Sequence, residues 1–239
     1  LQARVDELGV RDYYEENREL RQGNVNPVDP MAGKGKLYRN FKDDLSLFMR
    51  AVVRETIDSR DLFDDTMFDM FREIFQTCSN STARVMRVVA TGMGLNVISG
   101  LVNACLSQSK QAALKQRQLD NALASKRKEA KVEAEAIKKT MDQCSKNTEA
   151  CAGIKEMFNG VFTGRFRDYD PQIRAGCMAA VSNWMLEYPF MFLTDFYLKY
   201  LGWSMNDKSS LVRLEVLKGL RRLYADGTKA SIMDGFTNR

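Results

Sequence analysis

Side chains suited to acid–base or nucleophilic catalysis are sparse in this sequence. Histidine is absent, which excludes His-based triads and HExxH zinc sites. The paired acids Asp43-Asp44 and Asp64-Asp65 are adjacent, so on a helix their carboxylates point about 100° apart and cannot share a proton. Neither a Gly-rich phosphate loop nor a nucleophile elbow occurs. We therefore predict a protein that is not an enzyme, needs no cofactor and takes no small-molecule substrate.

The cysteines form neither a metal-binding nor a disulfide pattern. Their number is odd, and no two are spaced as CxxC. We therefore expect free thiols in a reducing compartment, without a structural metal. The five cysteines are Cys78, Cys105, Cys144, Cys151 and Cys177.

Residues 110–139 concentrate positive charge. They hold nine Lys or Arg against four acids, and their net charge of +5 equals that of the whole chain. Because few aromatic residues lie nearby, such a surface would bind double-stranded DNA through its phosphates, independently of base sequence. The alternative reading is a solvated helix face on which acids and lysines pair three or four residues apart. The cations predicted to contact DNA are Lys110, Lys115, Arg117, Lys126, Arg127, Lys128 and Lys131.

Helical periodicity runs through nearly the whole sequence and predicts an all-α fold. Apolar residues recur at three- and four-residue steps, and no alternating run with a hairpin dipeptide occurs. Residues 101–152 contain neither glycine nor proline. Their apolar stripe becomes narrow in its second half, which predicts a long basic helix over about 101–144 that partly projects from the fold.

The stretch from Val88 to Ser109 has no charged side chain and is long enough to cross a bilayer. It also contains three glycines and several polar residues, which are weak or unfavourable contributors to membrane insertion. We therefore predict a buried central helix and no membrane partner.

The last third of the chain reads as a helical repeat. Arg174 and Arg213 lie 39 residues apart, and each follows a β-branched residue and an upstream Asp. This pattern is typical of stacked helix pairs of the HEAT type, which form a solenoid with an extended surface. We expect one continuous solenoid with two parts, residues 1–156, which include the long basic helix, and residues 157–239. Since the chain begins with Leu1, we expect it to be part of a longer protein.

Residues 157–224 carry a long and specific similarity. It lies in FNGVFTGRFRDYDPQIRAGC (158–177), NWMLEYPFMFLTDFYLKYLGW (183–203) and SMNDKSSLVRLEVLKGLRRLY (204–224). These segments resemble the conserved domain of the stromalin, or stromal-antigen, family of cohesin subunits, and a weaker resemblance covers residues 36–157. It implies a HEAT-like solenoid that acts as a scaffold in sister chromatid cohesion and chromatin loading, in the nucleus and on chromosomes.

The resemblance also implies three partners. These are the kleisin subunit of cohesin, double-stranded DNA on a basic surface that includes the long helix, and regulator peptides with an aromatic-x-aromatic motif. The family's peptide groove falls on Phe166, Arg167 and Trp203 in this sequence. Phe166 stands where the better-known animal members have Tyr, so a hydroxyl hydrogen bond is lost.

Two alternatives stay open at this point. An aromatic residue on a packed helix pair is more often core than pocket. We expect Trp203, which follows Gly202 at a helix end, to be partly exposed, and Trp184 to be core. The function could also be that of a pure protein–protein interaction module, with the DNA contacts made elsewhere in the complex.

Overall fold

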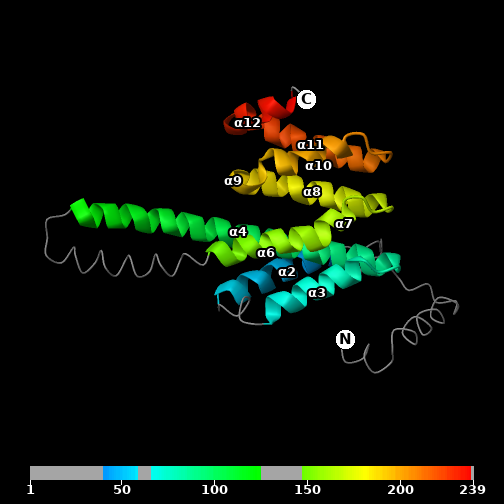
Figure 1. Cartoon of the computed structure of the whole chain (residues 1–239), viewed down its shortest axis with the longest axis horizontal. Helices are drawn as coiled ribbons and strands as arrows, with labels where there is room; N and C mark the ends of the chain where they lie inside the picture. The colour runs from blue at the N-terminus through cyan, green and yellow to red at the C-terminus, as the bar shows by residue number, and fades with distance from the viewer. Residues whose placement is uncertain (1–39, 59–65, 125–146, 238–239) are drawn as a thin grey trace. The chain divides into compact units, whose positions relative to one another are not determined.

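The computed structural model describes residues 40–58, 66–124 and 147–237, which form helices and the turns between them (Figure 1). The chain divides into two compact units, Leu1–Lys42 and Asp43–Arg239. The described residues lie almost entirely in the second unit, and no strand occurs among them. The predicted all-α class is therefore confirmed. The predicted division at residue 156 stays a prediction.

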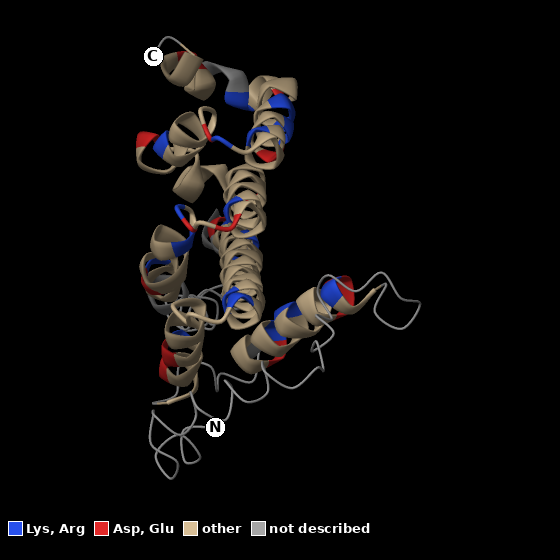
Figure 2. Ribbon diagram, turned by 90° about the vertical axis from the view of Figure 1, so that its right-hand side faces the viewer, with Lys and Arg blue, Asp and Glu red and all other residues tan. Residues whose placement is uncertain are grey.

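Within the second unit, the longer helices form two layers (Figures 1 and 2). In one layer α8 contacts both α4 and α11, and the helices of the other layer pack against this stack. The first layer holds α4 (Arg84–Ala124), α8 (Pro171–Glu187) and α11 (Ser210–Ala225); the second holds α3 (Met67–Ser79), α6 (Asn147–Met157), α10 (Asp195–Ser204) and α12 (Gly227–Thr237). The remaining elements are α2 (Phe41–Asp58), the π-helix η1 (Phe158–Phe162), α7 (Thr163–Arg165) and α9 (Pro189–Phe192). This arrangement is the predicted helical solenoid.

Three buried or half-buried arginines repeat one set of contacts along the stack. Arg174 Nη1 donates to the carbonyl oxygen of Asp168, six residues earlier, and its Nε and Nη2 donate to the Asp207 carboxylate at 2.8 Å. Arg213 Nη1 donates in the same way to the carbonyl oxygen of Asp207. The spacing of Arg174 and Arg213 therefore marks a true structural repeat, and in Figure 2 charged segments meet at the turns between helices.

Arg87 makes the corresponding contacts one helix pair earlier, which the sequence did not reveal. Its Nη1 donates to the carbonyl oxygens of Ser81 and Thr82, and its Nε donates to Asp168 Oδ2 at 3.1 Å. Each arginine thus closes its own turn, and Arg87 and Arg174 also bind the aspartate of the next turn. We call these contacts of Arg87, Asp168, Arg174, Asp207 and Arg213 the arginine ladder.

Apolar residues at three- and four-residue steps form the buried faces of α8 and α11. Ile173, Cys177, Val181 and Trp184 are buried on α8, where Tyr188 is half-buried, and Val212, Val216, Leu220 and Leu223 are buried on α11. The two helices approach closely because α11 has glycine at position 219. A Cβ added there would lie 2.1 Å from Ser182 Oγ.

The two helices predicted over residues 88–109 and about 101–144 are parts of one helix. The structure has a single helix from Arg84 to Ala124. Gly94 and Gly100 lie inside this helix, where they allow close packing: a Cβ at Gly100 would lie 2.8 Å from Val53. Glycine lowers helix propensity, but tertiary contact overrides that cost here. Residues 125–144 of the predicted helix lie outside the described residues.

The two halves of α4 have different surroundings. Residues 84–118 are long and apolar enough to cross a membrane, but 61% of the apolar window is buried inside the fold, as in the core helix of a soluble protein. From Lys110 to Asp120, the described side chains are exposed or half-buried. The expectation of a buried first half and a partly projecting basic half is therefore confirmed for the described residues, 84–124.

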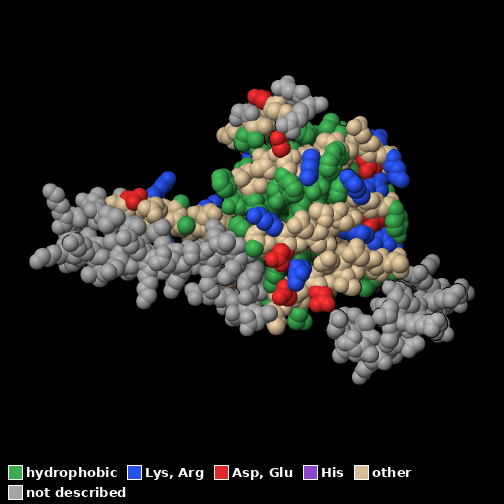
Figure 3. Space-filling model, in the orientation of Figure 1, with side chains coloured by type: hydrophobic (Ala, Val, Ile, Leu, Met, Phe, Trp, Pro, Cys, Tyr) green, Lys and Arg blue, Asp and Glu red, His purple; other side chains and the backbone are tan. Residues whose placement is uncertain are grey.

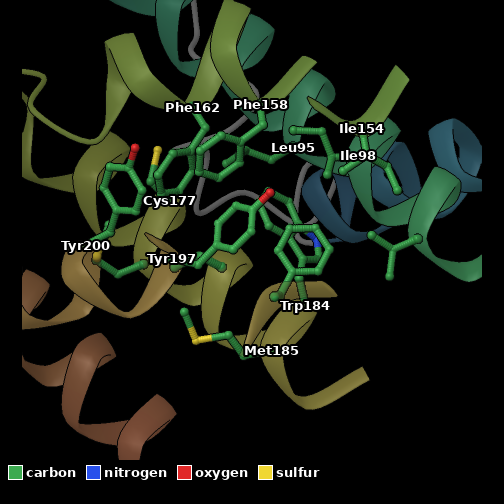
Figure 4. Packing of buried hydrophobic residues seen from close by; sticks show 14 of the residues in the cluster. Leu95, Ile98, Ile154, Phe158, Phe162, Cys177, Trp184, Met185, Tyr197 and Tyr200 are labelled. Atoms are coloured by element: carbon green, nitrogen blue, oxygen red, sulfur yellow. The ribbon is translucent and has the colours of Figure 1, made fainter. Parts of the chain in front are cut away.

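Aromatic rings dominate the core where α4, η1, α8 and α10 meet (Figure 4). Trp184 is fully buried, and its ring contacts Phe158 edge-on with centroids 6.3 Å apart. Its indole N–H donates to Ser99 Oγ at 2.9 Å, and Ser99 donates in turn to the carbonyl oxygen of Leu95. Burying the indole therefore leaves no unpaired polar group, as the predicted core position of Trp184 requires.

The ion pair of Asp207 with Arg174 in the arginine ladder should make the stability of the fold decrease at acidic pH. Hydrogen bonds from Arg174 and, less strongly, from the Ser209 backbone lower the pKa of Asp207. A lowered folded-state pKa adds stability that is complete above the unfolded pKa of about 4 and is lost as pH falls through the folded pKa. At pH 7, Asp207→Asn is expected to lower the free energy of unfolding by about 1.5–3 kcal/mol, the range for hydrogen bonds to charged groups.

Urea unfolding of wild type and variant from pH 7 downward measures this difference. It should shrink below the unfolded pKa and vanish once Asp207 itself is protonated. Glu215→Gln removes one charge from the more exposed pair of Glu215 with Lys218 and serves as the control. A difference between wild type and Asp207→Asn that stays constant with pH would contradict the assignment.

Candidate functional site

A row of stacked aromatic rings leads from the core to the surface. Phe158 stacks on Phe162 with centroids 4.3 Å apart, Phe162 on Phe166 at 5.9 Å, and Phe166 on Trp203 at 6.3 Å. The first three rings are at most 9% exposed, whereas Trp203 is 53% exposed. The outer end of the row is therefore available to a ligand and its inner end is anchored in the core.

Local sequence explains why the rings line up. Phe158, Phe162 and Phe166 are spaced four residues apart along η1, α7 and the following turn, which places them on one side of the helical segment. The ring of Tyr200 of α10 makes edge-to-face contacts with all three of these rings and with Trp203, at centroid distances between 4.8 and 5.7 Å. Burial raises the pKa of Tyr200, and the nearby Arg167 partly offsets this effect. The tyrosine thus stays neutral and fixes the row in place.

Two cations lie over the outer rings. The guanidinium carbon of Arg167 is 4.9 Å from the centre of the Phe166 ring and 5.4 Å from that of Trp203. Lys199 Nζ is 4.1 Å from the centre of Phe196 and 5.6 Å from that of Trp203. We call Phe166, Arg167, Phe196, Lys199 and Trp203 the aromatic–cation surface. On the face of the molecule drawn in Figure 3, hydrophobic side chains are interspersed with Lys and Arg.

This surface is suited to a peptide that carries aromatic and acidic groups. Phe196 and Trp203 are each about half exposed and offer ring faces for stacking. The cations are held beside those faces, where they could meet carboxylates or backbone carbonyl oxygens of a ligand. Aromatic and arginine residues of this kind supply most of the energy in protein–protein interfaces.

The structure brings the three predicted groove residues together. Phe166 and Trp203 are far apart in sequence, and Arg167 touches the rings of both. Trp203 is half exposed as predicted, while Phe166 is only 9% exposed and supports the surface from below. Phe166 is thus both packed against the core and part of the aromatic–cation surface.

Sequence reasoning missed Phe196 and Lys199. The spacing of Lys199 and Trp203 puts both on one side of α10, as it does for Phe196 and Tyr200. Such four-residue spacing is common on surface helices, so the spacing alone does not indicate a binding site, and only the ring geometry in the structure does.

The arginine ladder holds the turn that carries Arg167. The neighbouring Asp168 is buried and accepts hydrogen bonds from Arg87 Nε and Arg165 Nη1 on its Oδ2 atom. Its Oδ1 atom accepts from the backbone N–H of Asp170 at 2.8 Å. Because these bonds fix residues 168–170, Arg167 leaves the turn in a defined direction, toward the rings.

The predicted DNA-binding residues fall in two groups. Lys110, Lys115 and Arg117 lie on the projecting half of α4, where Lys110 and Arg117 are exposed and Lys115 is half-buried. The others, Lys126, Arg127, Lys128 and Lys131, lie outside the described residues. In the described part of the chain, no three Cys, Asp or Glu side chains gather as a metal site would require.

Two family models match the chain. The model described as the STAG domain matches residues 27–142, and the one described as the stromalin conservative domain matches residues 167–239. The second match contains Arg167, Phe196, Lys199 and Trp203, whereas Phe166 directly precedes it. The first match contains α4 and its basic half.

Curated relatives are similar over most of this chain. Sister-chromatid cohesion protein 3 of Arabidopsis thaliana is 32% identical over 212 residues, which are 88% of this chain and 19% of the relative. Cohesin subunit SA-3 of Rattus norvegicus is 32% identical over 215 residues, covering 88% of this chain and 17% of the relative. Cohesin subunit psc3 of Schizosaccharomyces pombe is 25% identical over all of this chain and 23% of its own. The chain thus spans about a fifth of the length of these relatives.

A solved structure shares the fold. The cohesin subunit Scc3 from Z. rouxii superposes with a TM-score of 0.78 at 24% sequence identity, covering 97% of this chain and 27% of the other. At that identity the likeness shows the helical architecture alone.

Proposed function

Because the chain belongs to the stromalin family of cohesin subunits, we propose that it is a non-catalytic scaffold segment that binds a partner peptide on its aromatic–cation surface. One observation carries the proposal: Arg167, from the turn after α7, lies over the ring of Phe166 in the same turn and over the ring of Trp203 in α10. The partner is a regulator peptide with an aromatic-x-aromatic motif, and the kleisin subunit of cohesin completes the groove. The resemblance of this segment to the family supports both partners.

The chemistry of the surface supports the motif. Two aromatic side chains separated by one residue point to the same side of an extended peptide and can meet neighbouring ring faces. Phe196 and Trp203 are two exposed aromatics of one helix, and Lys199 lies over both rings. A carboxylate at the middle or flanking position of the peptide would then meet a cation.

A peptide pair tests this function. A labelled Phe-Asp-Phe peptide and the same peptide with Ala-Asp-Ala should be titrated with the chain, alone and with a kleisin segment, by fluorescence anisotropy. We expect saturable binding of the first peptide, tighter in the presence of kleisin, and no saturable binding of the second. Equal affinity of the two peptides would reject the aromatic–cation surface as the binding site.

The projecting half of α4 supports a second candidate function, sequence-independent binding of double-stranded DNA. Lys110 and Arg117 are exposed, and the other described side chains between Lys110 and Asp120 are exposed or half-buried. The wider segment 110–139 carries the net charge of the whole chain. Cations spaced along a projecting helix can follow a phosphate backbone without reading bases. Together the two functions would place the protein on chromosomes in the nucleus.

Removal of two described cations should flatten the salt dependence of DNA binding. Each phosphate contact lowers the slope of log K against log salt by about 0.9. Lys110→Ala combined with Arg117→Ala is therefore expected to reduce the magnitude of the slope by up to about 1.8. Titrations with a random-sequence duplex at several salt concentrations measure it.

The matched control is Lys218→Ala combined with Arg221→Ala, which removes the same charge from α11. An equal loss in the control would indicate that only net charge matters and would reject the assigned site. Failure of the wild-type chain to bind duplex even at low salt would favour the alternative, a pure protein–protein module.

A further inference from the structure

We propose that Cys105 and Cys151 are an oxidisable pair that forms a reversible disulfide between α4 and α6 when the chain meets a small-molecule disulfide. Their Sγ atoms lie 3.7 Å apart, although the residues are 46 positions apart in sequence. The two helices pack against each other along this region. This inference goes beyond the proposed scaffold function and does not depend on it.

The geometry is that of two reduced thiols that lie close enough to be oxidised to a disulfide. A disulfide needs its sulfurs about 2 Å apart, with Cβ atoms about 4 Å apart. The thiols already touch at 3.7 Å, so the sulfurs need to approach each other by less than about 2 Å to reach bonding distance. The cysteines at 78, 105, 151 and 177 are all free thiols in this structure.

The two thiols differ in access, which sets the order of the steps. Cys105 is fully buried, whereas Cys151 is partly exposed. The Cys151 thiolate attacks one sulfur of oxidised glutathione, which forms a mixed disulfide and releases one glutathione thiolate. Cys105 then loses its proton to solvent and attacks Cys151 Sγ, which releases the second glutathione. Two protein thiols are oxidised to one disulfide, and one molecule of oxidised glutathione is reduced to two molecules of glutathione thiol.

The second step is the slower one. Burial and the neighbouring Cys151 raise the pKa of the Cys105 thiol to about 12, so little thiolate is present at neutral pH. Closure should therefore accelerate as pH rises, and the mixed disulfide on Cys151 should be the transient species. The finished bond would tie α4 to α6 just before the exposed cations Lys110 and Arg117.

Peptide mapping of the intact chain tests the proposal. After treatment with oxidised glutathione and blocking of free thiols, trypsin should release peptides 88–110 and 147–155 joined through Cys105 and Cys151. The intact mass should fall by two hydrogen atoms and return on reduction. Closing a loop of this length should also raise the thermal midpoint by up to about 10 °C.

Serine variants separate the outcomes. Cys151→Ser should abolish the joined peptides, Cys105→Ser should leave a stable glutathionyl group on Cys151, and Cys177→Ser, a buried control, should leave the cross-link intact. The proposal fails if wild type yields no joined pair. It also fails if Cys151 pairs with Cys144, whose tryptic peptide 140–146 is distinct.

Discussion

Replacing Trp203 with alanine is expected to weaken binding of an aromatic-x-aromatic peptide by about 30- to 1,000-fold, the range of interface hot spots. Trp203 is the exposed end of the ring row and contacts both Arg167 and Lys199. Trp203→Ala would therefore remove one ring on which a ligand can stack, and Arg167 and Lys199 would lose their contact with that ring. Anisotropy titration of the labelled peptide measures the change.

Phe190→Ala is the matched control, because Phe190 is 89% exposed and lies outside the aromatic–cation surface. It should leave peptide affinity unchanged. Since Trp203 is half exposed, its loss should change thermal stability little. A Trp203→Ala chain that unfolds early, or that binds the peptide as wild type does, would show that this ring supports the fold and not a ligand.

Replacing Asp168 with alanine is expected to lower the free energy of unfolding by about 3–5 kcal/mol, the cost of breaking a buried ion pair. The side chains of Asp168 and Arg87 are 1% and 4% exposed. Without the carboxylate, Arg87 would remain a buried charge with no counterion, and Arg165 would lose its 2.7 Å contact. Urea unfolding followed by circular dichroism gives the measurement.

Asp69→Ala removes a carboxylate from the exposed pair of Asp69 with Arg72 and should change stability little. If Asp168→Ala proved as mild as this control, the buried ladder would not be a main source of stability. Because Asp168 also fixes the turn after Arg167, the same variant should weaken peptide binding under conditions in which it remains folded.

Sequence periodicity predicted those parts of the fold that depend on local pattern. The apolar faces of α8 and α11 and the contrast between Trp184 and Trp203 follow from three- and four-residue spacing and from helix ends. The repeat of Arg174 and Arg213 was visible because two copies have the same neighbours. Arg87 was missed because its turn, Ser81-Thr82, lacks the aspartate that marks the later copies.

Other features of the fold depend on long-range packing, which sequence periodicity does not predict. The sequence predicted a buried helix over residues 88–109 and a basic helix over about 101–144, but only the structure shows that they are one helix, in which Gly100 allows close contact with Val53. Phe196 and Lys199 joined the candidate site only through the ring geometry of α10. The Cys105–Cys151 contact likewise required the pairing of α4 with α6, which no spacing in the sequence encodes.

The two tryptophans of this chain occupy opposite environments, and that has a practical consequence. Trp184 is sealed beside Ser99, whereas Trp203 faces solvent next to two cations. Intrinsic emission therefore contains a blue component that acrylamide cannot quench and a red component that it can. Ligand binding would change only the quenchable emission of Trp203, and unfolding would abolish the shielded emission of Trp184. One unlabelled sample therefore reports binding and unfolding separately.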